Sequence, residues 1–187
     1  MTLAAFIVAF GVSRVLSGWV QQFVRRRETP VYPLQLAVSG LMLLALLQNS
    51  WAMFMAQGAD WTFFTFLVMI LLQISIVGAL ALINPPPDYA SSIRHYYFDV
   101  RKAVFGLLIA WIVIGGFFDM LGPLSSDQPL DPNIPYALMY SIRAVAVAVF
   151  GLMAWSGRES HHWAGFIVAS VIQALWIVGF SYNPASA

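Results

Sequence analysis

Two arginines lie inside long apolar runs of the chain, where a membrane protein would be surrounded by hydrocarbon. Arg14 is near the middle of the first run, and Arg143 lies at a comparable depth in the fifth. A charge at that depth costs about 3 kcal/mol or more on insertion scales, so each arginine needs polar partners inside a helix bundle. The other runs offer such groups at mid-depth or toward the outer side: Gln48, Asn49, Gln73, Tyr140, Gln173 and, near the end of the fourth run, Asp119.

These residues support two interpretations. Arginines and amides with no carboxylate at mid-span would form a polar path or cavity that suits anions. Alternatively, Arg14 and Arg143 bond carbonyls, amides and Asp119 and only lock the helices together. In the first run, Gly11, Arg14, Gly18 and Gln22 follow one another at helical spacing, so they share one face and predict that this face is turned toward the bundle.

All three histidines lie at one rim of the predicted bundle, His95 before the fourth run and His161 and His162 before the sixth. With Asp99 and Glu159 nearby in sequence, they could hold a divalent metal ion. The alternative is that they are interfacial histidines that pair with acids and lipid phosphates. The absence of an H-x-x-x-H pattern disfavours the metal.

Several absences restrict the chemistry further. The chain has no cysteine, which excludes disulfides and thiolate metal sites. No histidine or lysine lies near the middle of a predicted span, which disfavours a bis-histidine haem and a retinal Schiff base. No Ser/His/Asp order and no phosphate-binding glycine loop is present. We therefore predict no cofactor and favour a protein that is not an enzyme.

The elements that position these residues are transmembrane helices. Of the 187 residues, 60% are hydrophobic and 9% are charged, whereas soluble domains carry about 25% charged residues. The sequence predicts an all-α bundle formed by one domain, residues 1–187, with six spans: 3–24, 31–56, 61–83, 92–121, 136–155 and 163–182. About 20 apolar residues cross a bilayer. The net charge of +1 indicates no nucleic-acid partner.

The loop charges predict the orientation. Loops one, three and five carry Arg25, Arg26, Arg27, Arg94, Arg101, Lys102 and Arg158, whereas loops two and four carry only acidic charges. Because Lys and Arg stay on the cytoplasmic side, the odd loops are expected inside and both termini outside, in the periplasm.

The fourth span is too long for the bilayer alone. Its predicted residues 92–121 would extend about 45 Å as a helix, against a hydrocarbon core of about 30 Å. Its first turns are therefore expected in the headgroup region or the cytosol. They carry Arg94, His95, Asp99, Arg101 and Lys102, which we expect to form a docking surface for a partner or for anionic lipid headgroups.

Two further patterns, an internal repeat and a resemblance to other proteins, extend over much of the chain. Trp61, Phe64 and Ile70 align with Trp163, Phe166 and Ile172, which is compatible with two three-helix halves in inverted orientation. The segments 61–67, 84–87 and 95–102 resemble a group of small, uncharacterised bacterial six-helix membrane proteins. That resemblance implies a six-helix fold and a bacterial inner membrane, and it transfers no activity and no site residues.

Two classes of function remain open. The first is a small transporter or channel with a polar interior that contains Arg14 and Arg143. The second is a non-catalytic accessory or scaffold subunit of a larger membrane complex. A lipid-headgroup or metal enzyme at the rim is a third. The partners expected are the lipid bilayer and its anionic headgroups, together with a homo-oligomer or a larger complex.

Overall fold

The computed structural model of the chain is a bundle of long helices. It describes residues 2–27, 29–55, 62–86, 89, 92–125 and 136–180, although the side chains of 2–4, 52–55, 118–125, 136, 179 and 180 lie outside this description. The helices are α1 (Thr2–Val24), α2 (Pro33–Met55), α3 (Phe63–Ile83), α4 (Ile93–Ser125), α5 (Tyr136–Trp155) and α6 (Glu159–Phe180). All six are long and apolar enough to cross a membrane, which confirms the predicted all-α fold class.

Local chemistry explains where several helices begin. Pro33 opens α2, where its fixed φ suits the first helical position and its missing N–H would have had no partner in any case. Thr62 caps α3, because its hydroxyl accepts a hydrogen bond from the Thr65 backbone N–H. Glu159 lies in the first turn of α6, where a carboxylate is favoured by the helix dipole. This helix therefore begins at Glu159 and includes both rim histidines, rather than beginning at Trp163.

The far end of α4 also differs from the prediction. The loop expected from residue 122 starts later, because α4 continues to Ser125. Pro123 lies in the last turn of this helix, and the helix ends two residues after it.

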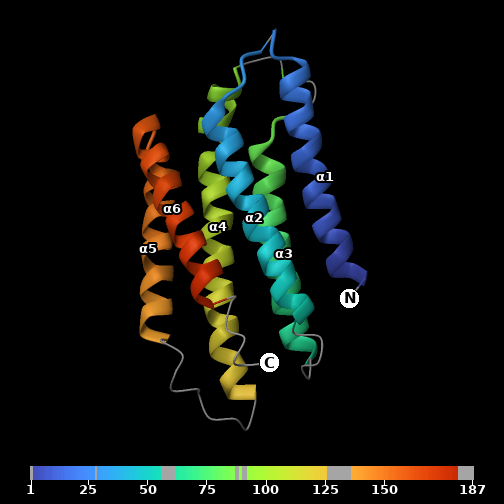
Figure 1. The fold of residues 1–187 in the computed structure, drawn as a ribbon, viewed down its shortest axis with the longest axis vertical. Coiled ribbons are helices and arrows are strands. Elements are labelled where there is room, and N and C mark those ends of the chain that lie inside the picture. Colours follow the sequence, from blue (N-terminus) through green and yellow to red (C-terminus); the bar gives the residue numbers. More distant parts are fainter. Residues whose placement is uncertain are drawn as a thin grey trace.

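The helices form a ring with one helix outside it. Each of α2, α3, α4, α5 and α6 packs against the next, and α6 returns to α2, whereas α1 packs on the outside against α2 and α3 (Figure 1). α3 is the most enclosed helix, and most of its residues from Val68 to Ile83 are buried. It also has a mean hydropathy of 2.7, the highest of the six, as expected for a helix that contacts neighbours on most sides. The inverted repeat stays a prediction.

The odd-numbered connections meet at one end of the bundle, shown uppermost in Figure 1. α1 starts and α6 stops at the opposite end. The arginines of the odd loops therefore share one face, which we call the odd-loop end. Which side of the membrane that end faces stays a prediction from the arginine bias.

We predict that Gly11→Ala destabilises the bundle by about 1–3 kcal/mol, because overpacking a buried contact forces side chains to move. A methyl group at Gly11 would lie 2.9 Å from both Leu46 Cδ2 and Val77 Cγ2, on the two helices that carry α1. Gly151→Ala is the matched control, since a methyl group there meets nothing within 4 Å. Thermal unfolding in detergent measures both variants, and equal melting temperatures would contradict the close packing of α1.

Candidate functional site

Polar side chains from all five ring helices occur at one level of the bundle. Gln173 on α6 donates a hydrogen bond to Gln48 Oε1 on α2. The Arg143 guanidinium of α5 lies 5.2 Å from the centre of the Trp176 ring on α6. We call the whole set at this level the polar belt: Gln48, Asn49, Gln73, Trp111, Arg143, Gln173 and Trp176.

Contacts around Gly115 show which part of α4 lies at the level of the belt. A methyl group at Gly115 would lie 3.6 Å from both Arg143 Nη1 and Leu72 Cδ2, so α5 and α3 meet α4 at this height. Gln73, which is fully buried, follows Leu72 directly on α3. Trp111 lies one turn before Gly115 on α4. The belt is therefore built from several helices and not from a stripe on one of them.

Arg143 is held between an aromatic ring and a glycine pair. A methyl group at Gly116 would lie only 2.9 Å from Arg143 Nη1, so any larger residue there would displace the guanidinium. The Trp176 ring adds the attraction of its negative face for a cation, which is worth about 2 kcal/mol where water is excluded. Sequence reasoning missed both tryptophans of the belt, because neither carries a charge.

Two buried donors of the belt have no acceptor within the described residues: Asn49 Nδ2 and Trp111 Nε1. Burying an N–H without a hydrogen bond costs about 1–3 kcal/mol. Both are donors, and Arg143 adds a positive charge to the same belt. The belt therefore favours a ligand that accepts hydrogen bonds or carries negative charge.

The other residues that the sequence predicts in the interior do not lie together. Arg14 is half-buried on α1, outside the ring, and its positive charge acts on the Tyr96 hydroxyl of α4. The structure therefore does not bring Arg14 and Arg143 into one interior. Tyr140 is half-buried one turn from Arg143 on α5, and Asp119 lies in α4 with its side chain outside the description.

Aromatic side chains and one histidine fill the ring between the belt and the odd-loop end. His162 is fully buried and bonds the Tyr97 hydroxyl through Nδ1 at 2.9 Å and the Ser156 carbonyl through Nε2 at 2.9 Å. A carbonyl can only accept, so Nε2 carries the proton and Nδ1 accepts from Tyr97. Phe105 lies 5.6 Å from the His162 ring and stacks on Phe150 at 6.0 Å. We call Tyr97, Phe105, Phe150 and His162 the aromatic plug.

The predicted rim residues mostly pair with one another at the surface. Arg94 Nε donates to Glu159 at 3.0 Å, which joins α4 to α6, and His95 approaches Asp99 at 3.3 Å within α4. Arg101 donates to the Phe98 carbonyl, and the Lys102 ammonium lies 6.0 Å from the Trp155 ring. A docking role for this rim stays a prediction.

The histidines are not gathered into a metal centre. His161 Nδ1 bonds the Ser156 hydroxyl at 2.8 Å, His162 is engaged within the plug, and His95 is exposed beside Asp99. Among the described residues, no group of three His, Asp or Glu side chains is placed to hold a metal ion.

Tyr32 lies beside the Arg94–Glu159 pair, just before α2 begins. Burial raises the pKa of its hydroxyl to about 12, and the negative charge of Glu159 acts in the same direction. Its ring meets Tyr97 edge-on at 5.5 Å, so the rim pair and the plug are in contact through Tyr32.

We predict that the free energy of unfolding falls between about pH 10 and pH 12, partly because of Tyr32. The unfolded chain loses this proton near the ordinary pKa of 10.0, whereas the folded chain keeps it until about 12, so stability present below that window is lost as the pH rises. Chemical denaturation across this pH range should show that the free energy of unfolding falls less steeply in Tyr32→Phe than in the natural protein. Glu159→Gln should lower the Tyr32 pKa in an ultraviolet titration, and an unchanged pKa would contradict the contact with the carboxylate.

Fold and site together define a class: a six-helix, multi-pass membrane bundle with a polar interior layer. Comparison of the chain with protein-family models, with curated proteins and with solved structures finds no match, so no family is identified. The functional argument therefore depends on the geometry alone.

Proposed function

We propose that the protein is a small transporter or channel whose path runs through the five-helix ring, with the polar belt as its binding layer. The observation that carries this proposal is the chemistry of the belt. Arg143 offers a cation, and Asn49 Nδ2 and Trp111 Nε1 are two buried donors with no acceptor among the described residues. A small anion or an acceptor-rich solute is the complementary ligand.

The cost of keeping Arg143 in the membrane supports this role. A helix bundle held together by packing alone would not need a charge at this depth. Trp176 and the Gly115–Gly116 pair shape a space for the guanidinium, rather than leaving it to extend toward the headgroups. In a low-dielectric interior, such a cation attracts an anion far more strongly than it would in water.

The aromatic plug would act as the barrier of this path. Its side chains come from α4, α5 and α6 and lie between the belt and the odd-loop end. A solute that leaves toward that end has to part these rings, so the described arrangement corresponds to a path closed on one side. With the odd loops cytoplasmic, as the arginines predict, the closed side faces the cytoplasm of a bacterial cell.

We predict that Arg143→Gln lowers anion flux about tenfold or more, since a hydrogen bond to a charged group contributes about 1.5–3 kcal/mol. Purified protein in liposomes would be tested with chloride, nitrate, acetate and phosphate by stopped-flow light scattering. Arg158→Gln is the matched control, because Arg158 is exposed in the loop before α6. Flux equal to that of protein-free liposomes for every anion, or an unchanged flux in Arg143→Gln, would contradict the proposal.

One observation favours the accessory-subunit alternative. Two hollows lined by described residues lie near the odd-loop end of α1, and neither includes a belt residue. Hollows placed away from the belt suit a protein that works by contact with a partner. This alternative predicts that a stoichiometric partner co-purifies from native membranes, and that Arg143→Gln weakens that association while liposomes show no flux.

A further inference from the structure

A chain of three amides runs between helices at the odd-loop end. Asn84 donates from Nδ2 to the Leu80 carbonyl at 2.8 Å. Gln35 donates from Nε2 to Asn84 Oδ1 at 3.0 Å and to the Ile83 carbonyl at 3.2 Å. Gln22 donates from Nε2 to Gln35 Oε1 at 2.8 Å. The chain joins the end of α3 to α2 and α1.

Backbone chemistry fixes the direction of this chain. The Leu80 and Ile83 carbonyls can only accept, so Asn84 and Gln35 must turn their amide nitrogens toward them. Each amide then presents its oxygen to the next residue. The last of these oxygens, Gln22 Oε1, has no donor within the described residues, although Gln22 is only 4% exposed. An amide flip cannot remove this acceptor without breaking the bond to Gln35.

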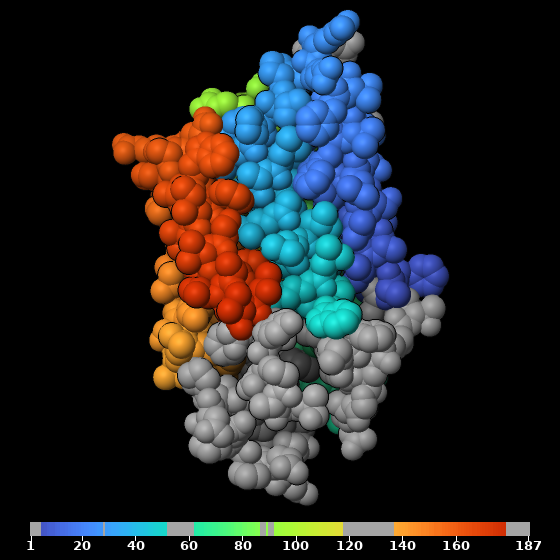
Figure 2. All heavy atoms as spheres, in the orientation of Figure 1, coloured from blue at the N-terminus to red at the C-terminus, as the bar shows by residue number. Residues whose placement is uncertain are grey.

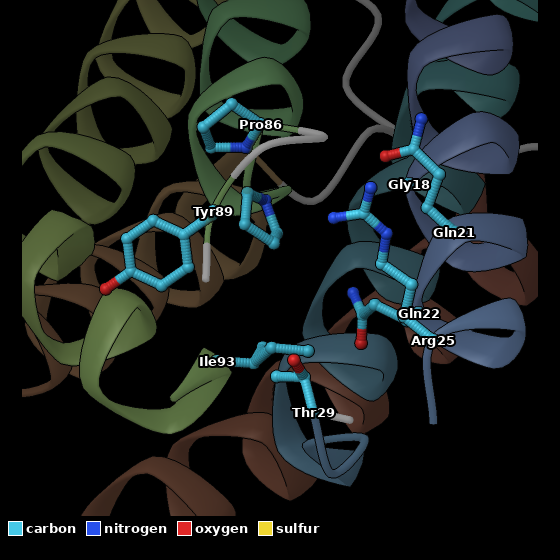
Figure 3. A pocket seen from close by; sticks show the side chains of 9 residues that line it. Gly18, Gln21, Gln22, Arg25, Thr29, Pro86, Tyr89 and Ile93 are labelled. Carbon is cyan, nitrogen blue, oxygen red and sulfur yellow. The ribbon is translucent and has the colours of Figure 1, made fainter. Parts of the chain in front are cut away.

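Gln22 lines a crevice between α1 and the segment that follows α3. The crevice has a volume of about 30 Å³, and Arg25, Thr29 and Tyr89 line it together with Gln22 (Figure 3). Figure 3 shows Gln22 and Arg25 extending from α1 toward Pro86 and Tyr89. A methyl group at Gly18 would lie 2.8 Å from Asn84 Oδ1, so this glycine lets α1 approach the amide chain closely.

The crevice combines two complementary groups. Gln22 Oε1 requires an N–H or O–H donor, and Arg25 supplies a positive charge for an anion. The crevice lies at the end of α1, where the apolar span gives way to the arginines of the first loop. Phospholipid headgroups occupy this level of a bilayer. A headgroup that carries both an ammonium donor and a phosphate fits both groups.

We propose that this crevice binds the headgroup of phosphatidylethanolamine, with the primary ammonium on Gln22 Oε1 and the phosphodiester facing Arg25. A choline headgroup carries the same phosphate, but its trimethylammonium has no N–H to donate to Gln22 Oε1. The site therefore discriminates between two lipids of equal charge. It does not depend on the proposed transport function.

The experiment counts lipids retained by the purified full-length protein in native mass spectrometry. Phosphatidylethanolamine, its N-methyl and N,N-dimethyl forms and phosphatidylcholine are offered at equal concentration with identical acyl chains. We expect retention to fall along this series, with phosphatidylethanolamine about tenfold above phosphatidylcholine, the ratio that a lost hydrogen bond to a charged group gives. This series needs no variant, so it tests the proposal even if substitutions impair folding.

Variants separate the two contacts. Gln22→Met should abolish the preference for phosphatidylethanolamine, whereas Arg25→Gln should weaken retention of both lipids, because both carry the phosphate. Arg26→Gln is the matched control, since Arg26 lines a different hollow with Val20 and Phe23 and should change neither result. Equal retention of the two lipids by the wild type, or a preference that survives in Gln22→Met, would overturn the proposal.

A competition experiment distinguishes a lipid from a soluble ligand. O-phosphoethanolamine offers the same ammonium and phosphate without acyl chains. If it displaces phosphatidylethanolamine only at far higher concentration, the lipid is the ligand. If it competes at equal concentration, the lipid assignment is wrong.

Discussion

The lipid interior offers no hydrogen-bond partners, and this constraint determines several of the contacts between helices. A polar side chain within a span has to find its partner in the protein, either in its own helix, as Ser75 does at the Leu71 carbonyl, or in another helix. The amide chain from Gln22 to Asn84 joins α1, α2 and the end of α3, and the Trp19 indole bonds Ser39 at 2.9 Å between α1 and α2. Gln48 and Gln173 close the ring between α2 and α6. Apolar side chains then pack in the space between these hydrogen bonds. Apolar packing alone would not determine which helices meet, because lipid tails are as apolar as the helix faces.

Because lipid supplies no hydrogen bonds, a buried polar atom without a partner among the described residues indicates the kind of ligand that its site would bind. In the belt, the two such atoms without a partner among the described residues are donors, on Asn49 and Trp111, and the belt also contains the Arg143 cation. At the odd-loop end the atom is an acceptor, Gln22 Oε1, at the end of an amide chain whose direction is fixed. The two places therefore call for opposite chemistry, an anion in the ring and an ammonium group at the rim. The protein can contain both sites, because the belt and the crevice lie on different sides of α2 and α3. Figure 2 shows how the faces of α1, α2 and α6 cover the ring on one side.

Much of this architecture follows from the sequence. Apolar run length predicts six spans, the loop arginines predict that odd connections share one end, and helical spacing predicts that Arg14, Gly18 and Gln22 lie on one face. Spacing within one helix cannot tell which neighbour that face meets. For this reason Arg14 and Arg143 could be expected in one interior, whereas α1 lies outside the ring. His162 was placed at the rim, and the structure buries it, because α6 begins at Glu159 and turns this residue toward Tyr97. The sequence pattern does not single out Asn84, although its amide ends the chain that joins three helices.

The most direct test of the central claim, that the belt is a water-accessible binding layer inside the ring, is the reactivity of single cysteines. The natural chain has no cysteine, so Asn49→Cys carries one thiol without background. Val145→Cys is the control, because Val145 lies two residues from Arg143 and is 50% exposed on the outer, lipid-facing surface. In liposomes, the account predicts that Asn49→Cys reacts with small charged thiol reagents, faster with an anionic than with a cationic one, and that permeating anions slow this reaction. Val145→Cys should stay unreactive. An Asn49→Cys thiol as inert as that of Val145→Cys would contradict the account.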